Sequence, residues 1–338
     1  LLRTWMGNQI GIATALLIAA GRAGTVVTDL LSVVIANATS VRFAYYSGLI
    51  FIVLVFPVSL HIRVLEKKRQ RITTPADECT SNSTTTSQYG DSIIRWIKDG
   101  LASFTEMFWL ISIAGAIFYS LMFTFNMVIA NFLIQDLCNG TCCDSTTITC
   151  TAQTDAETTT SYLMTIPYSV AIAMMPIAGR LVDLYGIRGI LFMTGFVLSV
   201  TAFTLFQLFQ QVLSLHITGL VLHGLGIGFT TTAFFPALHL FVPEKYAFFG
   251  VSIFQFTIST FGTILPSVIS VLGGSDLSDF TSVIPFLLGI AALGLLMSIV
   301  INIIDSLKYR TINAPLGDRC VSAKSFEESP QDQNEVIV

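Results

Sequence analysis

Long apolar runs alternate with short polar segments along most of this chain. A helix needs about 20 residues to cross the ~30 Å hydrocarbon core of a bilayer, because it rises ~1.5 Å per residue. Eight runs satisfy that length, and they predict transmembrane helices at 8–36, 43–62, 107–133, 160–179, 189–211, 214–241, 248–272 and 283–304. The pattern therefore predicts an all-α polytopic membrane protein.

The polar segments divide the chain into four parts. Residues 1–62 hold two predicted helices, 63–106 form one long connection, 107–304 hold six helices, and 305–338 form a tail. The connection ends with Ile94, Ile97, Leu101 and Phe104 at helical spacing, a pattern typical of an amphipathic helix on a membrane surface. The tail is polar and partly acidic, which predicts disorder.

Only 11% of the 338 residues are charged, against about 25% in soluble proteins. Basic and aromatic residues do not alternate as they do in nucleic-acid-binding surfaces, so we predict no nucleic-acid partner. No motif of an enzyme stands out, and we predict neither catalysis nor a bound cofactor or metal.

The basic residues predict the orientation. If 63–106 and the tail are cytosolic, 15 of the 17 Lys and Arg residues lie on the cytosolic side, as the positive-inside rule requires. The exceptions are Arg22, inside the first predicted helix, and Arg42, on the opposite face. The cytosolic set is Arg3, Arg63, Lys67, Lys68, Arg69, Arg71, Arg95, Lys98, Arg180, Arg188, Lys245, Lys308, Arg310, Arg319 and Lys324.

The loop 134–159 then faces a lumen or the exterior. It has no Lys or Arg and carries the sequon Asn139-Gly140-Thr141, which predicts glycosylation at Asn139. Its cysteines are Cys138, Cys142, Cys143 and Cys150. An oxidising compartment favours at least one disulfide among them, with the pairing left open. Zinc binding is a weaker alternative, since no His lies nearby.

Arg22 is the most informative residue in the chain. A charge in the middle of a membrane span costs about 2.5–3.5 kcal/mol on insertion scales, and such a residue usually marks a substrate or ion site. Two alternatives remain: a structural or gating pair with Asp29, seven residues further on, or a side chain that reaches the lipid interface.

Other intramembrane residues have two interpretations each. Tyr119 and Phe123 line a substrate cavity or pack in the core. Asn126 and Gln255 are predicted to form hydrogen bonds across helices. His223, among glycines in Leu-His-Gly-Leu-Gly-Ile-Gly, is a proton relay or, as we favour, a close-packed polar residue.

The segment Gly179-Arg180-Leu181-Val182-Asp183-Leu184-Tyr185-Gly186-Ile187-Arg188 resembles the G-x-x-x-D-x-x-G-x-R loop of the major facilitator superfamily. Glycines at the first and eighth positions suit a tight turn and close helix approach. The resemblance implies a cytosolic gating loop, in which Asp183 faces the positive end of a neighbouring helix. Arg188 would pair with Asp183 or with lipid phosphate. Ile187 departs from the basic residue common at that position.

A closer resemblance is to the lysosomal dipeptide transporters of that superfamily. It rests on Ala20-Gly21-Arg22-Ala23-Gly24-Thr25-Val26, on Phe108-Trp109-Leu110-Ile111 with the following Tyr119 and Phe123, and on Phe235-Pro236-Ala237 leading to Phe241-Val242-Pro243-Glu244. The resemblance implies helices 5–12 of a twelve-helix major facilitator fold, truncated at the N-terminus. It makes Arg22 the anchor of a dipeptide carboxylate, with Tyr119 and Phe123 beside it.

The function implied is export of dipeptides from the lysosomal lumen to the cytosol by alternating access. No acid lies at the middle of a predicted span, which favours a uniporter. Tyr309-Arg310-Thr311-Ile312 matches a Y-x-x-hydrophobic sorting pattern. Candidate partners are the lipid bilayer, a glycosylated lysosomal accessory membrane protein and a second copy in a homodimer. The alternatives are a small organic-anion (monocarboxylate-like) carrier, a non-transporting receptor or scaffold, and location in the plasma membrane.

Overall fold

The computed structural model describes residues 10–40, 42–43, 46, 53, 57, 60–61, 64–65, 89–138, 151–209, 212–273 and 280–314. Within these ranges every regular element is helical. The helices are α2 (Ile10–Ala38), α4 (Tyr89–Ser103), α5 (Glu106–Cys138), α6 (Thr151–Tyr185), α7 (Arg188–Leu208), α8 (Leu213–His239), α9 (Ala247–Leu272) and α10 (Phe280–Ile304), with the short η2 (Glu244–Tyr246) and η3 (Asp305–Tyr309).

Seven of these helices are long and apolar enough to cross a membrane. The prediction of an all-α polytopic membrane protein is therefore confirmed at that level. The predicted span 43–62 lies almost wholly outside the described residues. Helix α6 extends well beyond its predicted limits of 160–179, since a helix satisfies its backbone internally and can continue into polar sequence outside the apolar run.

Contacts divide the chain into two compact units, Leu1–Val27 with Ser103–Val338 and, separately, Thr28–Ala102. The boundary falls inside α2. In the smaller unit, α4 forms over most of the stretch predicted to be an amphipathic helix. Trp96, Ile97 and Leu101 of α4 remain 37–41% exposed.

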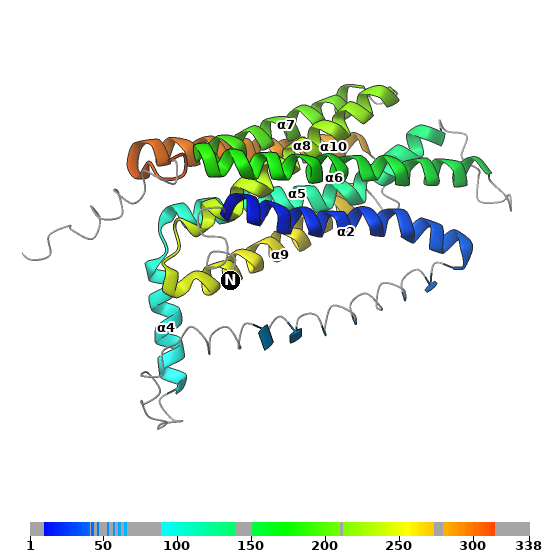
Figure 1. The fold of residues 1–338 in the computed structure, drawn as a ribbon. Coiled ribbons are helices and arrows are strands. Elements are labelled where there is room, and N and C mark those ends of the chain that lie inside the picture. The colour runs from blue at the N-terminus through cyan, green and yellow to red at the C-terminus, as the bar shows by residue number, and fades with distance from the viewer. Residues whose placement is uncertain are drawn as a thin grey trace, which may run out of the picture. The chain divides into compact units, whose positions relative to one another are not determined.

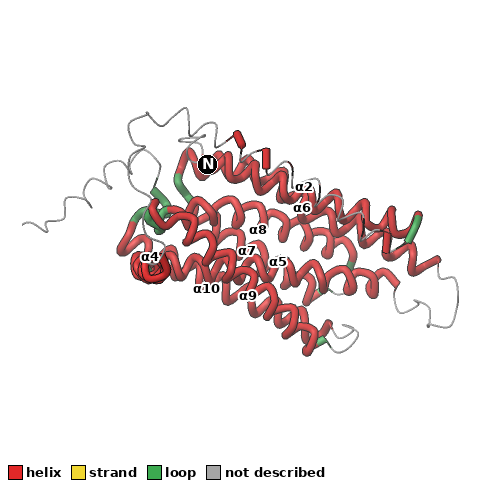
Figure 2. The backbone as a smooth tube through the Cα atoms, turned by 90° about the horizontal axis from the view of Figure 1, so that it is seen from below, coloured by secondary structure: helices red, strands yellow, loops and turns green. Residues whose placement is uncertain are grey.

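In the larger unit, α5, α6, α7, α8 and α10 run side by side, and α9 crosses more obliquely (Figures 1 and 2). Helix α8 contacts both α6 and α7 extensively. A Cβ added at Gly224 would lie 2.5 Å from the backbone oxygen of Pro167 on α6, and one at Gly226 would lie 2.8 Å from that of Gly195 on α7. Glycines two positions apart face opposite sides of a helix, so this run lets α8 approach both neighbours.

Aromatic rings fill the interior of this unit. The rings of Phe234 and Phe254 lie 4.5 Å apart, and those of Phe118 and Phe196 lie 5.4 Å apart, edge to face. All four side chains are at most 1% exposed. These rings hold α5, α7, α8 and α9 together by offset and edge contacts, which are the favourable geometries for aromatic pairs.

A folded cap follows the last helix, so the prediction of disorder from residue 305 is wrong for residues 305–314. Asp305 is 2% exposed, and its Oδ1 accepts hydrogen bonds from the backbone N–H of Thr311 at 3.0 Å and of Ile312 at 3.1 Å. Asn313 Oδ1 accepts the backbone N–H of Gly189 at 2.9 Å. The carboxylate of Asp305 thus closes the cap on itself, and the amide of Asn313 docks the cap on α7, although its composition is polar.

Candidate functional site

Arg22 lies between two tyrosines of the larger unit. Its Cζ atom is 5.9 Å from the ring centroid of Tyr119 on α5 and 5.8 Å from that of Tyr168 on α6. Arg22 shares a face of α2 with the buried Ala15 and Ala19, because residues spaced by three and four lie one above another on a helix. The small alanines let α2 approach its neighbours, and the same face then carries the guanidinium inward.

Arg22 itself is only half-buried, whereas Tyr119 and Tyr168 are 8% and 2% exposed. Among the side chains that the structure describes, no carboxylate pairs with Arg22. The side chain of Asp29, the pairing partner considered from the sequence, lies outside the described set. The guanidinium is therefore placed at two aromatic rings, is partly exposed and has no carboxylate partner among the described side chains.

Asn126 connects the two helices that carry these tyrosines. Its side-chain amide donates a hydrogen bond to the hydroxyl of Tyr168, which confirms the cross-helix bond predicted for Asn126. Sequence reasoning missed Tyr168. The available signal was its hydroxyl, since a tyrosine inside an apolar span usually has a hydrogen-bonding partner.

Phe123 continues the same face of α5, one turn beyond Tyr119. The two ring centroids are 6.4 Å apart, and Phe123 is 45% exposed. The structure thus brings the three residues predicted to bind substrate into one neighbourhood. Gln255 differs from its prediction, because it is exposed and forms no hydrogen bond with the described residues.

The last turns of α6, which carry Gly179 and Asp183 of the predicted gating loop, contact the beginning of α2. Asp183 accepts two backbone hydrogen bonds there, from Gly11 to Oδ1 at 2.8 Å and from Ile12 to Oδ2 at 2.9 Å. These are N–H groups that a helix leaves unpaired at its positive end, so the predicted contact of Asp183 with a helix N-terminus is confirmed. A Cβ at Gly179 would lie 2.8 Å from that of Ala15, which is the close approach expected.

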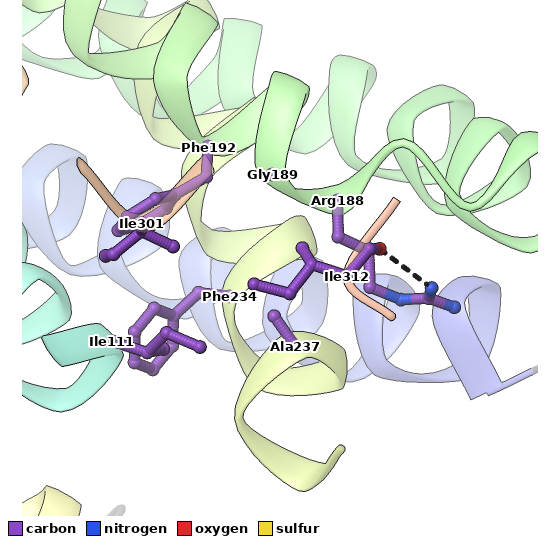
Figure 3. A pocket seen from close by; sticks show the side chains of 8 residues that line it. All are labelled: Ile111, Arg188, Gly189, Phe192, Phe234, Ala237, Ile301 and Ile312. Carbon is purple, nitrogen blue, oxygen red and sulfur yellow. Dashed lines mark hydrogen bonds between the residues drawn. The ribbon is translucent and has the colours of Figure 1, made fainter. Parts of the chain in front are cut away.

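Gly186 makes the turn itself, with a φ of 70° that glycine adopts without steric strain. Arg188, at the start of α7, corrects the sequence prediction. It is 3% exposed, and its Nη1 donates to the carbonyl oxygen of Ile312 at 3.4 Å. Figure 3 shows this side chain reaching toward the cap. Among the described residues Arg188 does not pair with Asp183, and the cap covers its side chain.

The pocket beside Arg188 is small and apolar. Ile111, Phe192, Phe234 and Ile301 contribute to its lining (Figure 3). Its free volume of about 10 Å³ is close to the minimum for a single water molecule. This space is a packing gap rather than a substrate site.

His223 is packed between aromatic rings. Its ring centroid is 4.3 Å from that of Phe125 and 5.6 Å from that of Phe203. The side chain is 1% exposed, and neither ring nitrogen has a hydrogen-bond partner among the described residues. A proton relay requires a hydrogen-bonded path, so the geometry favours the close-packed interpretation.

The sorting pattern lies in the folded cap. Tyr309 donates to Oε1 of Glu106 at 3.3 Å, and Lys308 forms an ion pair with the same carboxylate. Ile312 is 1% exposed. A receptor that reads a linear Y-x-x-hydrophobic signal needs both side chains free, so this conformation does not present the signal.

The luminal predictions remain untested, since Asn139, Cys142, Cys143 and Cys150 lie outside the described residues and Cys138 is described only as the end of α5. In the described part of the chain, no cluster of three His, Cys, Asp or Glu side chains is placed to hold a metal ion. No protein-family model matches the chain, and no curated protein matches it.

Proposed function

We propose that this protein is a membrane transporter of the major facilitator type that exports dipeptides from lysosomes by alternating access. The observation that carries the proposal is Arg22, a half-buried guanidinium within a membrane span, against two tyrosine rings and without a carboxylate partner among the described side chains. A cation at that depth is costly unless an anion or water meets it. The carboxylate of a substrate supplies that anion and fits a guanidinium bidentately.

The contact of Asp183 supports a moving part at the cytosolic end. Helix α2 carries Arg22, and its first turn is held by the carboxylate of Asp183. A helix transmits displacement along its axis. A ligand that displaces Arg22 therefore also strains the hydrogen bonds between Asp183 and the first turn of α2. In the proposed cycle this contact forms in one conformation and is released in the other.

The proposal includes uniport, lysosomal location and the partners expected from the sequence. Uniport is supported by the described part of the Arg22 site, which contains tyrosines and an amide but no acid in contact with the guanidinium. Coupling to protons generally uses a carboxylate inside the membrane. Dipeptide export along a concentration gradient requires no such group.

Thermal unfolding of the purified protein tests the carboxylate anchor. We would compare the dipeptide Leu-Ala with its C-terminal amide, using native protein, Arg22→Gln and the control Arg180→Gln, which changes an exposed arginine. A ligand at 100 times its Kd stabilises the folded state by about 2.7 kcal/mol. We expect Leu-Ala to raise Tm in native protein and in the control, but not in Arg22→Gln.

A carrier of small monocarboxylates is the second candidate. It is favoured by the absence of an acid at the described site, since a dipeptide also presents an amino group. Lactate would then raise Tm through Arg22 while Leu-Ala would not. If neither ligand acts, or Arg22→Gln responds like native protein, the anchor is rejected and the receptor or scaffold interpretation takes its place.

A further inference from the structure

We propose that Asn126 and Tyr168 are positioning residues for Arg22 and thereby set how strongly the site prefers a carboxylate to a neutral group. The inference rests on the proposed role of Arg22 as carboxylate anchor. It concerns two residues that need not touch the ligand themselves.

The first step is the position of the guanidinium. Its Cζ atom is almost equally far from the two ring centroids, at 5.9 Å for Tyr119 and 5.8 Å for Tyr168. A guanidinium over an aromatic face is attracted by the negative face of the ring. All the N–H bonds of a guanidinium lie in its own plane, so a carboxylate in that plane can accept two of them.

The second step is the support of the two rings. Tyr119 and Asn126 are seven residues apart on α5, a spacing that puts them on the same face two turns apart. Tyr119 therefore meets the guanidinium directly, whereas Asn126 holds Tyr168 of α6 by its hydroxyl. One helix thus positions both rings.

The third step is the consequence for selectivity. A bidentate pair is sensitive to direction as well as to distance. If the ring of Tyr168 shifts, the guanidinium keeps its charge but loses its orientation, and the bidentate contact weakens. The binding of a neutral C-terminal amide depends less on a bidentate geometry, so it depends less on Asn126 and Tyr168.

The test measures the affinity ratio between Leu-Ala and its C-terminal amide in detergent-solubilised full chain. The variants are Asn126→Leu, Tyr168→Phe and the double variant, with Tyr162→Phe as the control on α6, where Tyr162 is 60% exposed. Tyr168→Phe keeps the ring and removes only its hydroxyl. We expect each single variant to reduce the ratio by about threefold to tenfold, the range for one hydrogen bond.

The double variant should reduce the ratio no further than the larger single change, since both residues act through the same bond. A purely structural role predicts instead that both ligands weaken equally and the ratio is unchanged, which overturns the inference. If Arg22→Gln abolishes the preference for Leu-Ala over its amide while Asn126→Leu and Tyr168→Phe keep the native affinity ratio, Arg22 is retained as the anchor and the positioning pair is rejected. Absence of any carboxylate preference in native protein rejects the proposed function itself.

Discussion

Two arginines in apolar surroundings, Arg22 and Arg188, differ in what meets the charge. Arg188 is 3% exposed and reaches the carbonyl of Ile312 in the cap. Arg22 is half-buried, against tyrosine rings, and meets no carboxylate among the described side chains. The chain encloses Arg188 and leaves Arg22 partly exposed. Accessibility, rather than the presence of a charge in apolar sequence, therefore separates a structural arginine from a candidate binding residue.

The largest expected effect is on ligand affinity at Arg22. Replacement by Gln removes the charge but keeps a polar group, and we expect roughly a hundredfold loss of Leu-Ala affinity, since two hydrogen bonds to a charged group are lost. Titration calorimetry measures this change. The Tm without ligand should remain near that of native protein, because no described carboxylate is left unpaired. A large drop in that Tm would make Arg22 structural, like Arg188.

The converse result is expected at Arg188. Substitution by Ala removes a long buried side chain and its bond to the cap, and we expect the free energy of unfolding to fall by about 1–3 kcal/mol. The Leu-Ala affinity should change less than twofold. Chemical denaturation gives the first quantity and ligand titration the second. Loss of affinity with unchanged stability would reverse the comparison.

A smaller effect is expected at Asp183. This residue lies near the end of α6, shortly before Arg188, and contacts the first turn of α2, the helix that carries Arg22. Asn at this position keeps one acceptor oxygen but loses the negative charge that faces the positive end of α2. That charge stabilises the contact by about 1 kcal/mol. In the proposed transport cycle, this loss should increase the opening at the end of the bundle where Asp183 meets α2. Labelling of a cysteine placed at Ile12 reports the opening, with Leu-Ala present and absent. An unchanged labelling rate would separate the loop from the movement of α2.

The smallest effect is expected at Glu106. The ion pair with Lys308 is more than half exposed on both sides, and exposed pairs contribute little because water and salt screen them. Replacement of Glu106 by Gln should leave both Tm and Leu-Ala affinity within experimental error. A clear destabilisation would mean that the cap depends on its surface contacts as well as on Asp305.

Much of this architecture follows from local sequence. The lengths of the apolar runs predict the helices, and a charge within one of these runs identifies Arg22 as a candidate binding residue. The glycines around Asp183 predict the turn, and the resemblance of this segment to a gating loop implies the contact with a helix end. Local patterns fail where the partner is distant in sequence. Asn313 contacts Gly189 124 residues away, so a polar tail gives no sign of a folded cap. Tyr168 was missed although its hydroxyl was a signal, because its partner Asn126 lies 42 residues away on another helix.

The alternating glycines of α8 restrict how the membrane helices can move. Gly224 and Gly226 bring the backbone against α6 on one side and against α7 on the other. A sideways shift of α8 that relieved one contact would tighten the opposite one, and rotation would replace glycine by a larger neighbour on both sides. The three helices therefore lack freedom to shift sideways or to rotate independently. Any conformational cycle has to carry them as one rigid block, with its bending confined to elements outside that block.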